Sequence, residues 1–535
     1  MAQKTTQEIL DTIPLRYRVP GGAVAVLKDG ELVGQRVWGY ANLDQRVPLT
    51  PGILMPICSI TKQFVCALLI DLQRNPTPAM LANGDIQEQF TEKLNELLPS
   101  EITQDSGLTI DNLCDMQSGI RDYWVMTTLW GAKPDDEFLV ERDCPPMLAR
   151  TKSFLFEPGT EYSYSNVNFH VLARMIERVT GEPLEKLLKE RVLTPAGMST
   201  AYLCPNTAKH PPPCVGYEGN EQNGFIAAVN RMEWSGDAGL VASLNDMIAY
   251  EKYLQRIYND TESWYHTVSK PHTFKDGSPT GYHYGLIHED IDGVDTLGHI
   301  GALRGYRIHR RHALHERLSV VVMFNHDGDV SGPVEDILRA MLNKAKPEHI
   351  PVEPSADWPG VYLDQGTQIA ITVAKGPQTG EIIATYASSR ETIKLTDANN
   401  GKSPSMLATV EGDLLRVHLL SANRKLEAQR IRPREASFKD PSLPGVYRSA
   451  EVDSTFHCSG EAGMLYGAFD GYLGKGPANP MRYLGDDVWI LACPRGLDAP
   501  GPGDWTVAFH RDESGTIAGF KIGCSLAWGI DFVKD

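Results

Sequence analysis

Ser59 and Lys62 stand three positions apart in an apolar stretch of this 535-residue chain, and together they offer a nucleophile and a base. On an α-helix, residues at i and i+3 share one face, so the serine hydroxyl and the lysine amine would project into the same cavity. Lysine can remove the serine proton only where its surroundings lower its pKa from about 10.4 toward about 7 or 8. The pair therefore predicts nucleophilic acyl transfer.

Two later stretches supply the other groups that acyl transfer needs. Tyr164 and Asn166 form a Tyr-x-Asn pattern, and a phenol with a free pKa near about 10 could relay a proton to the departing amine. His299-Ile300-Gly301 lies in strand-like sequence, where a glycine lets a substrate approach the backbone closely. Backbone N–H groups of Ser59 and Ala302 could then form the oxyanion hole, usually the largest contribution in acyl transfer.

Each of these patterns has a plain structural explanation when taken alone, because all three occur by chance in long proteins. Cys58 could also be read as a nucleophile, but on a helix its side chain would point about 100° away from that of Ser59, so packing is the better interpretation. His309, His312 and His315 stand among arginines, which makes a poor metal site. We expect no metal and no cofactor.

The sequence around Ser59 predicts a buried helix over residues 59–74, since residues 64–70 are too apolar for a surface helix. Free backbone N–H groups at its start would stabilise developing negative charge beside Ser59. Strand-like runs at 22–27, 31–38 and 318–324 predict one sheet built from both ends of this region. Further helices are expected at 166–180, 184–192, 244–253 and 334–346.

After a proline-bearing linker the sequence changes to short alternating segments with little helix. Trp358-Pro359-Gly360-Val361-Tyr362 and Leu443-Pro444-Gly445-Val446-Tyr447 look like the starts of two copies of one unit. Each copy has the size of a small closed β-barrel. The sequence therefore predicts three domains: a helix and sheet domain over 1–347 and two antiparallel β-barrels over 355–436 and 440–535.

The composition excludes several classes of partner. A formal net charge of −17 argues against binding nucleic acid, and the absence of an 18-residue apolar run argues against a membrane span. Nine scattered cysteines without a Cys-x-x-Cys pair fit reduced thiols in a cytoplasmic protein. We therefore expect a cytoplasmic protein that binds neither nucleic acid nor a membrane.

The order and spacing of the three patterns resemble those of the penicillin-recognising serine hydrolases, a family that includes class C β-lactamases, DD-peptidases and related esterases. Its motifs are Ser-x-x-Lys, Tyr-x-Asn and Lys-Thr-Gly or His-x-Gly. Within that family the chain is most similar to the D-stereospecific aminopeptidases, over essentially its whole length. The likeness is strongest at residues 55–66, 119–124, 236–248, 298–305 and 471–505.

This resemblance implies a β-lactamase-like α/β (α+β) catalytic domain with a central antiparallel sheet flanked by helices, followed by two β-barrels. Ser59 would be acylated, Lys62 and Tyr164 would move protons, and His299 would replace a lysine that other members use to hold a substrate carboxylate. Asn166, Gly301 and Ala302 would bind substrate. A homodimer is also implied.

The resemblance further implies that a loop of the last barrel, the γ-loop at about 493–504, reaches into the catalytic cleft. Asp498 would meet the α-ammonium of the substrate there, which would select small peptides or amino-acid amides with a free N-terminal amine. Ile300 departs from the glycine expected at its position, and its larger side chain would narrow the site.

The function implied is a serine aminopeptidase that hydrolyses the amide bond after an N-terminal D-residue, of the D-Ala or D-Ser type, or Gly, through an acyl-enzyme. One alternative is a related Ser-x-x-Lys esterase, amidase or β-lactam-hydrolysing enzyme, which would accept N-blocked substrates. An alternative of another class is a catalytically silent scaffold that binds peptides through its barrels.

Overall fold

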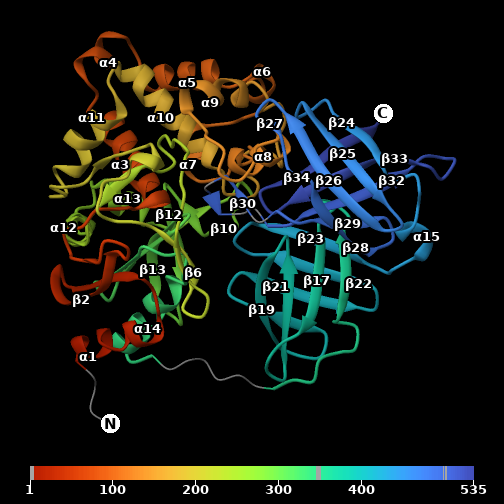
Figure 1. Ribbon diagram of the computed structural model, residues 1–535. Coiled ribbons are helices and arrows are strands. Elements are labelled where there is room, and N and C mark those ends of the chain that lie inside the picture. Colours follow the sequence, from red (N-terminus) through yellow and green to blue (C-terminus); the bar gives the residue numbers. More distant parts are fainter. Residues whose placement is uncertain (1–4, 345–350, 494, 498, 501–502) are drawn as a thin grey trace.

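The computed structural model describes residues 5–344, 351–493, 495–497, 499–500 and 503–535. Figure 1 shows a mixed helix and sheet region formed by the first part of the chain, with two strand-rich bodies beside it. Within the described residues, each strand pairing falls inside one of the ranges 1–347, 355–436 and 440–535. The domain boundaries themselves stay a prediction.

The first region is organised on an eight-stranded antiparallel sheet whose centre joins the two ends of the region. β1 pairs antiparallel with β15, with Val24 opposite Val322, so the sheet predicted from distant strand runs is confirmed. The strands, in spatial order, are β11 Tyr282–His283, β12 Leu286–Asp290, β13 Asp295–Leu303, β14 Tyr306–Ala313, β15 Leu318–Phe324, β1 Gly21–Lys28, β2 Glu31–Asn42 and β3 Val47–Pro48.

Helices cover both faces of this sheet, so its central strands are apolar throughout. Successive side chains of β1 enter different cores: Ala23 and Ala25 pack with the helix α3, whereas Val24 and Val26 pack with α14. The longer helices of the region are α3 Thr61–Arg74, α5 Ile86–Leu97, α8 Tyr123–Leu129, α9 Val140–Leu148, α10 Asn166–Thr180, α12 Leu244–Tyr258 and α14 Ser331–Met341.

The predicted helices are present, with shifted ends. The helix expected at 59–74 starts as a short 3-10 turn, η1 Cys58–Ile60, and continues as α3. The helix expected at 244–253 continues to Tyr258, because the buried Leu254 extends its apolar face by another turn. The helix expected at 184–192 is split into α11 Leu184–Leu188 and a wider turn, Lys189–Leu193.

The strand-rich bodies are two antiparallel β-barrels, as predicted. The first closes through β16 and β23. Its strands are β16 Gly360–Asp364, β17 Ala370–Lys375, β18 Glu381–Tyr386, β19 Ser389–Leu395, β20 Asn400–Lys402, β21 Met406–Glu411, β22 Leu414–Leu419 and β23 Arg424–Ile431. The second closes through β25 and β26. Its strands are β24 Gly445–Ser449, β25 Ser454–Glu461, β26 Met464–Gly471, β27 Gly474–Lys475, β28 Asn479–Gly485, β29 Val488–Leu491, β32 Trp505–Arg511, β33 Ile517–Cys524 and β34 Ala527–Lys534.

The second barrel packs on the helical side of the first region, next to α8 (Figure 1). Trp130 donates its Nε1 proton to the carbonyl of Val452 at 2.9 Å and packs its ring on Tyr472, with 5.2 Å between ring centroids. A Cβ added to Gly471 would lie 2.6 Å from the Trp130 Cα, so the two backbones approach as closely as glycine allows. Buried apolar side chains of the first region and of the second barrel belong to one continuous cluster.

Within the described residues, no helix is both long and apolar enough to cross a bilayer.

Candidate active site

The Lys62 amine lies at the centre of a buried network of polar atoms. Its Nζ donates to Ser59 Oγ at 3.1 Å, to Asn166 Oδ1 at 2.8 Å and to the Asp237 carbonyl oxygen at 2.7 Å. The side chain is fully buried, and this burial lowers the pKa of Lys62 to about 8. About a tenth of the amine is therefore neutral at pH 7, and this form can accept the Ser59 proton.

Ser59 is held at a sharp bend just before α3. Cys58 adopts φ +52°, in the left-handed region that is unfavourable for a residue with a side chain, and Ser59 follows in the 3-10 turn η1. The Cys58 side chain is buried, and burial raises the pKa of its thiol well above the usual value. The interpretation of Cys58 as a packing residue fits this environment.

The Tyr164 ring lies beside the Lys62 amine, with 4.8 Å between Nζ and the ring centroid. Its hydroxyl is buried and makes no hydrogen bond with any described residue. Burial raises the pKa of Tyr164 well above its usual value, although the neighbouring Ser59 hydroxyl acts in the opposite direction. Tyr164 is therefore a protonated phenol that can donate a hydrogen bond or a proton to a substrate atom.

Asn166, the first residue of α10, connects Lys62 to a buried carboxylate that the sequence analysis gave no role. Asp122 Oδ2 accepts from the Asn166 backbone N–H at 2.6 Å and from Asn166 Nδ2 at 2.7 Å. Asp122 Oδ1 caps the helix α8 by accepting from the Trp124 N–H at 2.9 Å. Burial raises the pKa of Asp122 to about 6. In the sequence, the one sign of a role for Asp122 was its position as a capping residue directly before the helix α8.

Asp237 is a second buried carboxylate without a role in the sequence analysis. Its Oδ2 accepts from the Tyr123 hydroxyl at 2.8 Å and from Trp124 Nε1 at 3.2 Å, and its Oδ1 accepts from the Ser235 N–H at 2.9 Å. These bonds fix the turn whose carbonyl oxygen binds Lys62. The sequence indicated a turn here but not what its side chain contacts.

His299 lies on β13 and is 2% exposed. Its Nδ1 is 2.6 Å from the Ile300 carbonyl oxygen, which can only accept, so Nδ1 carries the proton and Nε2 accepts from the Tyr282 hydroxyl at 3.1 Å. Burial, with the nearby Lys62, lowers the pKa of His299 to about 3. The imidazole is therefore neutral, and it lacks the charge of the lysine it was expected to replace.

Gly301 and Ala302 take different positions in the site. Ala302 lines the cavity beside Ser59, where its N–H was expected to contribute to the oxyanion hole, whereas Gly301 is not among the lining residues. A Cβ added to Gly301 would lie 2.3 Å from the Ile57 carbonyl oxygen. The glycine therefore lets β13 approach the backbone that precedes Ser59, which is a different reason from the expected contact with substrate.

The cavity in front of Ser59 has a volume of about 300 Å³ and mainly apolar walls. Ile300 is one of these walls, together with a residue that the sequence analysis missed, Leu526 of the second barrel. The Leu526 carbonyl oxygen accepts from the Asp122 N–H at 3.4 Å, so a barrel loop reaches the site. The lining residues are Ser59, Asp122, Trp124, Val125, Tyr164, Asn166, Trp234, Asp237, Ala238, Ile287, His299, Ile300, Ala302 and Leu526.

The stretch expected to form the γ-loop also approaches the first region. The two-residue strands β30 Arg495–Gly496 and β31 Ala499–Pro500 pair with each other, and they lie against α8 and β13 respectively. Asp498, the residue expected to bind the substrate ammonium, lies outside the described residues.

Asp115, His272 and His283 form a side-chain cluster that could be taken for a metal site. His283 Nδ1 and His272 Nε2 contact different oxygens of Asp115, at 2.9 Å and 3.1 Å. The two imidazoles are stacked, with 4.3 Å between centroids and 15° between planes. Because a ring nitrogen binds a metal in the ring plane, two parallel rings cannot easily bind one ion. Hydrogen bonds to the carboxylate account better for this arrangement.

Two family models together match nearly the whole chain: a beta-lactamase model at residues 2–344 and a model of D-aminopeptidase domain B at residues 351–533. A D-aminopeptidase of Brucella melitensis is 38% identical over 530 residues, with 99% of this chain and 98% of the relative covered. A D-aminopeptidase of Brucella anthropi is 40% identical over 521 residues, covering 97% and 96% respectively. The chain belongs to the D-aminopeptidase family.

Solved structures agree with this assignment at the level of the fold. A D-amino acid amidase from Ochrobactrum anthropi superposes with a TM-score of 0.51 and 20% identity, covering 63% of this chain and 98% of the amidase. A penicillin-binding protein homologue from Pyrococcus abyssi gives a TM-score of 0.51 at 19% identity, covering 88% and 98% respectively. The expected catalytic domain followed by two barrels is thus confirmed, and the chain is a hydrolase of the D-aminopeptidase family.

Proposed function

We propose that this protein is a serine aminopeptidase that hydrolyses the amide bond after an N-terminal D-residue, or glycine, through an acyl-enzyme on Ser59. The observation that carries the proposal is the 3.1 Å hydrogen bond from the buried Lys62 amine to Ser59 Oγ. Family membership supplies the class of substrate, since the relatives at 38% and 40% identity are named D-aminopeptidases.

The contacts support a sequence of proton transfers. Neutral Lys62 takes the Ser59 proton while Oγ attacks the substrate carbonyl carbon, and the resulting oxyanion accepts from the Ser59 and Ala302 N–H groups. When the C–N bond breaks, the leaving amine takes a proton from Tyr164, which regains it from Lys62. A water then attacks the ester carbonyl carbon and gives a proton to Tyr164, which passes its own proton to Lys62. When the bond from the carbonyl carbon to Oγ breaks, Ser59 Oγ takes this proton from Lys62.

The ammonium-binding role is assigned to Asp498 because the described carboxylates at the cavity are already occupied. Asp122 accepts from a backbone N–H at Oδ1 and from the backbone and side-chain amides of Asn166 at Oδ2. Asp237 also accepts hydrogen bonds at both of its carboxylate oxygens. Saturated acceptors bind an ammonium weakly. Asp498 lies in sequence between β30 and β31, and β31 lies against β13, the strand that carries His299.

The apolar walls of the cavity favour a small, uncharged side chain on the substrate, which agrees with small peptides and amino-acid amides as partners. We further propose a cytoplasmic location, for which the nine scattered cysteines, eight of them buried, are the support. A homodimer is proposed from the family resemblance, and light scattering on the purified protein tests it.

Activity on matched chromogenic anilides tests the function. The D-alanyl anilide should be hydrolysed well, the L-alanyl anilide poorly and the N-acetyl-D-alanyl anilide hardly at all, and Ser59→Ala should abolish turnover. Turnover of the L form alone, or activity that survives Ser59→Ala, would disprove the proposal. Equal activity on the N-blocked substrate would favour the esterase or amidase alternative.

Labelling with a fluorophosphonate separates an enzyme from a silent scaffold. We expect covalent labelling of Ser59 that falls when Lys62 is replaced by methionine. A folded protein that is not labelled at Ser59 would support the scaffold.

A further inference from the structure

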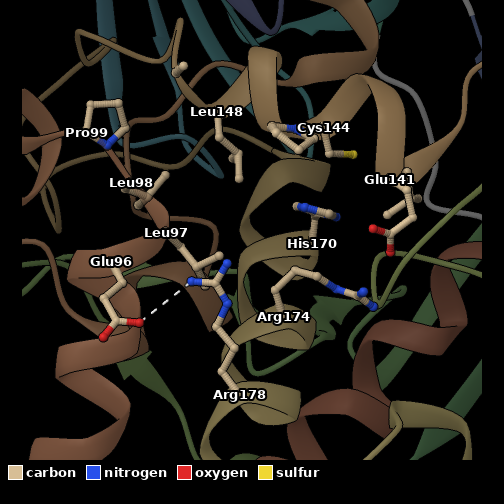
Figure 2. Close-up of a pocket in the computed structure, with 13 residues that line it drawn as sticks. Glu96, Leu97, Leu98, Pro99, Glu141, Cys144, Leu148, His170, Arg174 and Arg178 are labelled. Carbon is tan, nitrogen blue, oxygen red and sulfur yellow. Dashed lines mark ion pairs between the residues drawn. The ribbon is translucent and has the colours of Figure 1, made fainter.

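A hollow of about 570 Å³ opens beside α10, and it shares no lining residue with the catalytic cavity (Figure 2). It lies between α5, α9 and α10. α10 begins with Asn166 at the catalytic network, and at about 1.5 Å per residue His170 lies about 6 Å and Arg178 about 18 Å along the helix from it. The hollow is therefore a separate place on the molecule.

Three basic side chains point into this hollow from one face of α10. His170, Arg174 and Arg178 are spaced four residues apart, so they follow one another along the helix, as Figure 2 shows. Arg174 makes an ion pair with Glu177 at 3.0 Å, and Arg178 makes a long one with Glu96 at 3.7 Å. Neither contact uses the full donor capacity of a guanidinium group.

Two polar atoms in this row have no partner among the described residues. His170 is 2% exposed, and its Nδ1 makes no hydrogen bond, nor does the buried Nε of Arg174. Burial, with the neighbouring Arg174, lowers the pKa of His170 to about 3, so the ring is neutral. A neutral imidazole that carries its proton on Nδ1 can donate one hydrogen bond to a ligand. Buried donors without partners are costly, and a ligand that accepts from them would remove that cost.

The rest of the wall is largely apolar. On one side Leu97 ends α5 and is followed by Leu98 and Pro99. On the other side the wall is formed by Val140, Pro145 and Leu148 of α9. Glu96 and Glu141 stand at opposite sides of the hollow in Figure 2, and their two negative charges balance those of Arg174 and Arg178 among the lining residues. Such a wall is poorly suited to a phosphate and well suited to an acid that carries an apolar group.

We propose that this hollow binds a small organic acid, with its carboxylate on Arg174 and Arg178 and its apolar group between the residues of α5 and α9. Figure 2 shows the Arg174 and Arg178 guanidinium groups on two sides of the hollow, with the His170 ring between them, so a carboxylate bound between the two arginines would accept from both. The site is independent of the proposed reaction.

3-Phenylpropanoate is a suitable probe, because it lacks the amine that the catalytic site is proposed to select. Calorimetric titration should detect binding to the unaltered protein and at least tenfold weaker binding to Arg174→Gln and Arg178→Gln. Arg191→Gln is the matched control, since the Arg191 side chain is 25% exposed and ion-paired, against 27% for Arg174, but lies outside the hollow. The control should bind as the unaltered protein does.

Two further measurements keep the proposal open to disproof if an arginine variant folds poorly. Ala149→Trp fills the hollow from its exposed rim without altering a charge, so it should abolish binding. 3-Phenylpropanamide, which has the apolar group without the charge, should not bind. Binding that survives in Ala149→Trp, equal binding of the amide, or inorganic phosphate binding as tightly as the acid would overturn the proposal.

Discussion

Lys62 Nζ donates to Asn166 Oδ1 at 2.8 Å, and the orientation of this amide is fixed by the hydrogen bond that its nitrogen makes. Asn166 Nδ2 donates to Asp122 Oδ2 at 2.7 Å, and because a carboxylate only accepts, the amide oxygen must face Lys62. The lysine is thus held by an acceptor that cannot take its proton. Positioning the base in this way leaves its protonation to be set by burial and by the two nearby carboxylates.

The pH dependence of kcat/KM should show an ascending limb with a midpoint near the Lys62 pKa of about 8, because Lys62 must be neutral to accept the Ser59 proton. Asp122 raises the pKa of Lys62, so Asp122→Asn should move the limb to lower pH, by roughly a few tenths of a unit to one unit. Asp105→Asn, at an exposed position, is the control. An unchanged limb in Asp122→Asn would contradict the assignment to Lys62.

Lys62→Met should lower kcat/KM for the D-alanyl anilide by about 10²–10⁴-fold, the usual contribution of a general base. Methionine fills a similar volume, so circular dichroism should show an unchanged fold. Near-normal activity in this variant would mean that another group removes the Ser59 proton.

Gly301→Ala should destabilise the protein and reduce its activity, because a Cβ would lie 2.3 Å from the Ile57 carbonyl oxygen and force β13 away from Ser59. Overpacking of this kind costs about 1–3 kcal/mol. Gly52→Ala is the control, since the nearest atom to its Cβ would be 3.9 Å away. Urea unfolding of both variants measures the difference in their free energies of unfolding. The two values should be equal if Gly301 only contacted substrate.

Tyr123→Phe removes the 2.8 Å hydrogen bond to Asp237 and leaves a buried carboxylate with fewer donors. We expect a loss of about 1–3 kcal/mol in the free energy of unfolding. Tyr253→Phe, on α12, makes the same chemical change at a half-buried phenol that lies outside the catalytic cavity. Equal stabilities of the two variants would argue that Asp237 does not depend on Tyr123.

The local features of the site could be predicted from the sequence. The spacing of Ser59 and Lys62 placed both on one helical face, and the 3.1 Å contact between them confirms it. The apolar run after them predicted that the helix would be buried, which is also the reason the Lys62 pKa is low. Spacing and hydrophobicity act within a few turns, so they were sufficient here.

The residues that hold this pair could not be predicted in the same way. Asp122, Asp237 and Leu526 approach Lys62 and one another only through tertiary packing, across separations of up to 404 residues between Asp122 and Leu526. A buried aspartate also looks like any surface aspartate in sequence. The neutral state of His299 depends on its burial and on Lys62, and the Tyr282 hydroxyl that donates to it comes from β11, which is separated from β13 by β12.

The apolar cluster shared by the first region and the second barrel has a consequence for how the chain unfolds. The first barrel has a separate cluster built around Trp358 and Tyr362, which Trp528 of the second barrel joins, whereas Trp489 and Trp505 belong to the same cluster as the residues around Ser59. Calorimetry should therefore resolve two unfolding transitions and not three, because the second barrel should unfold together with the first region, which carries Ser59. A chain that ends before residue 440 would lose part of the apolar cluster that also surrounds Ser59, as well as the barrel loop that carries Leu526.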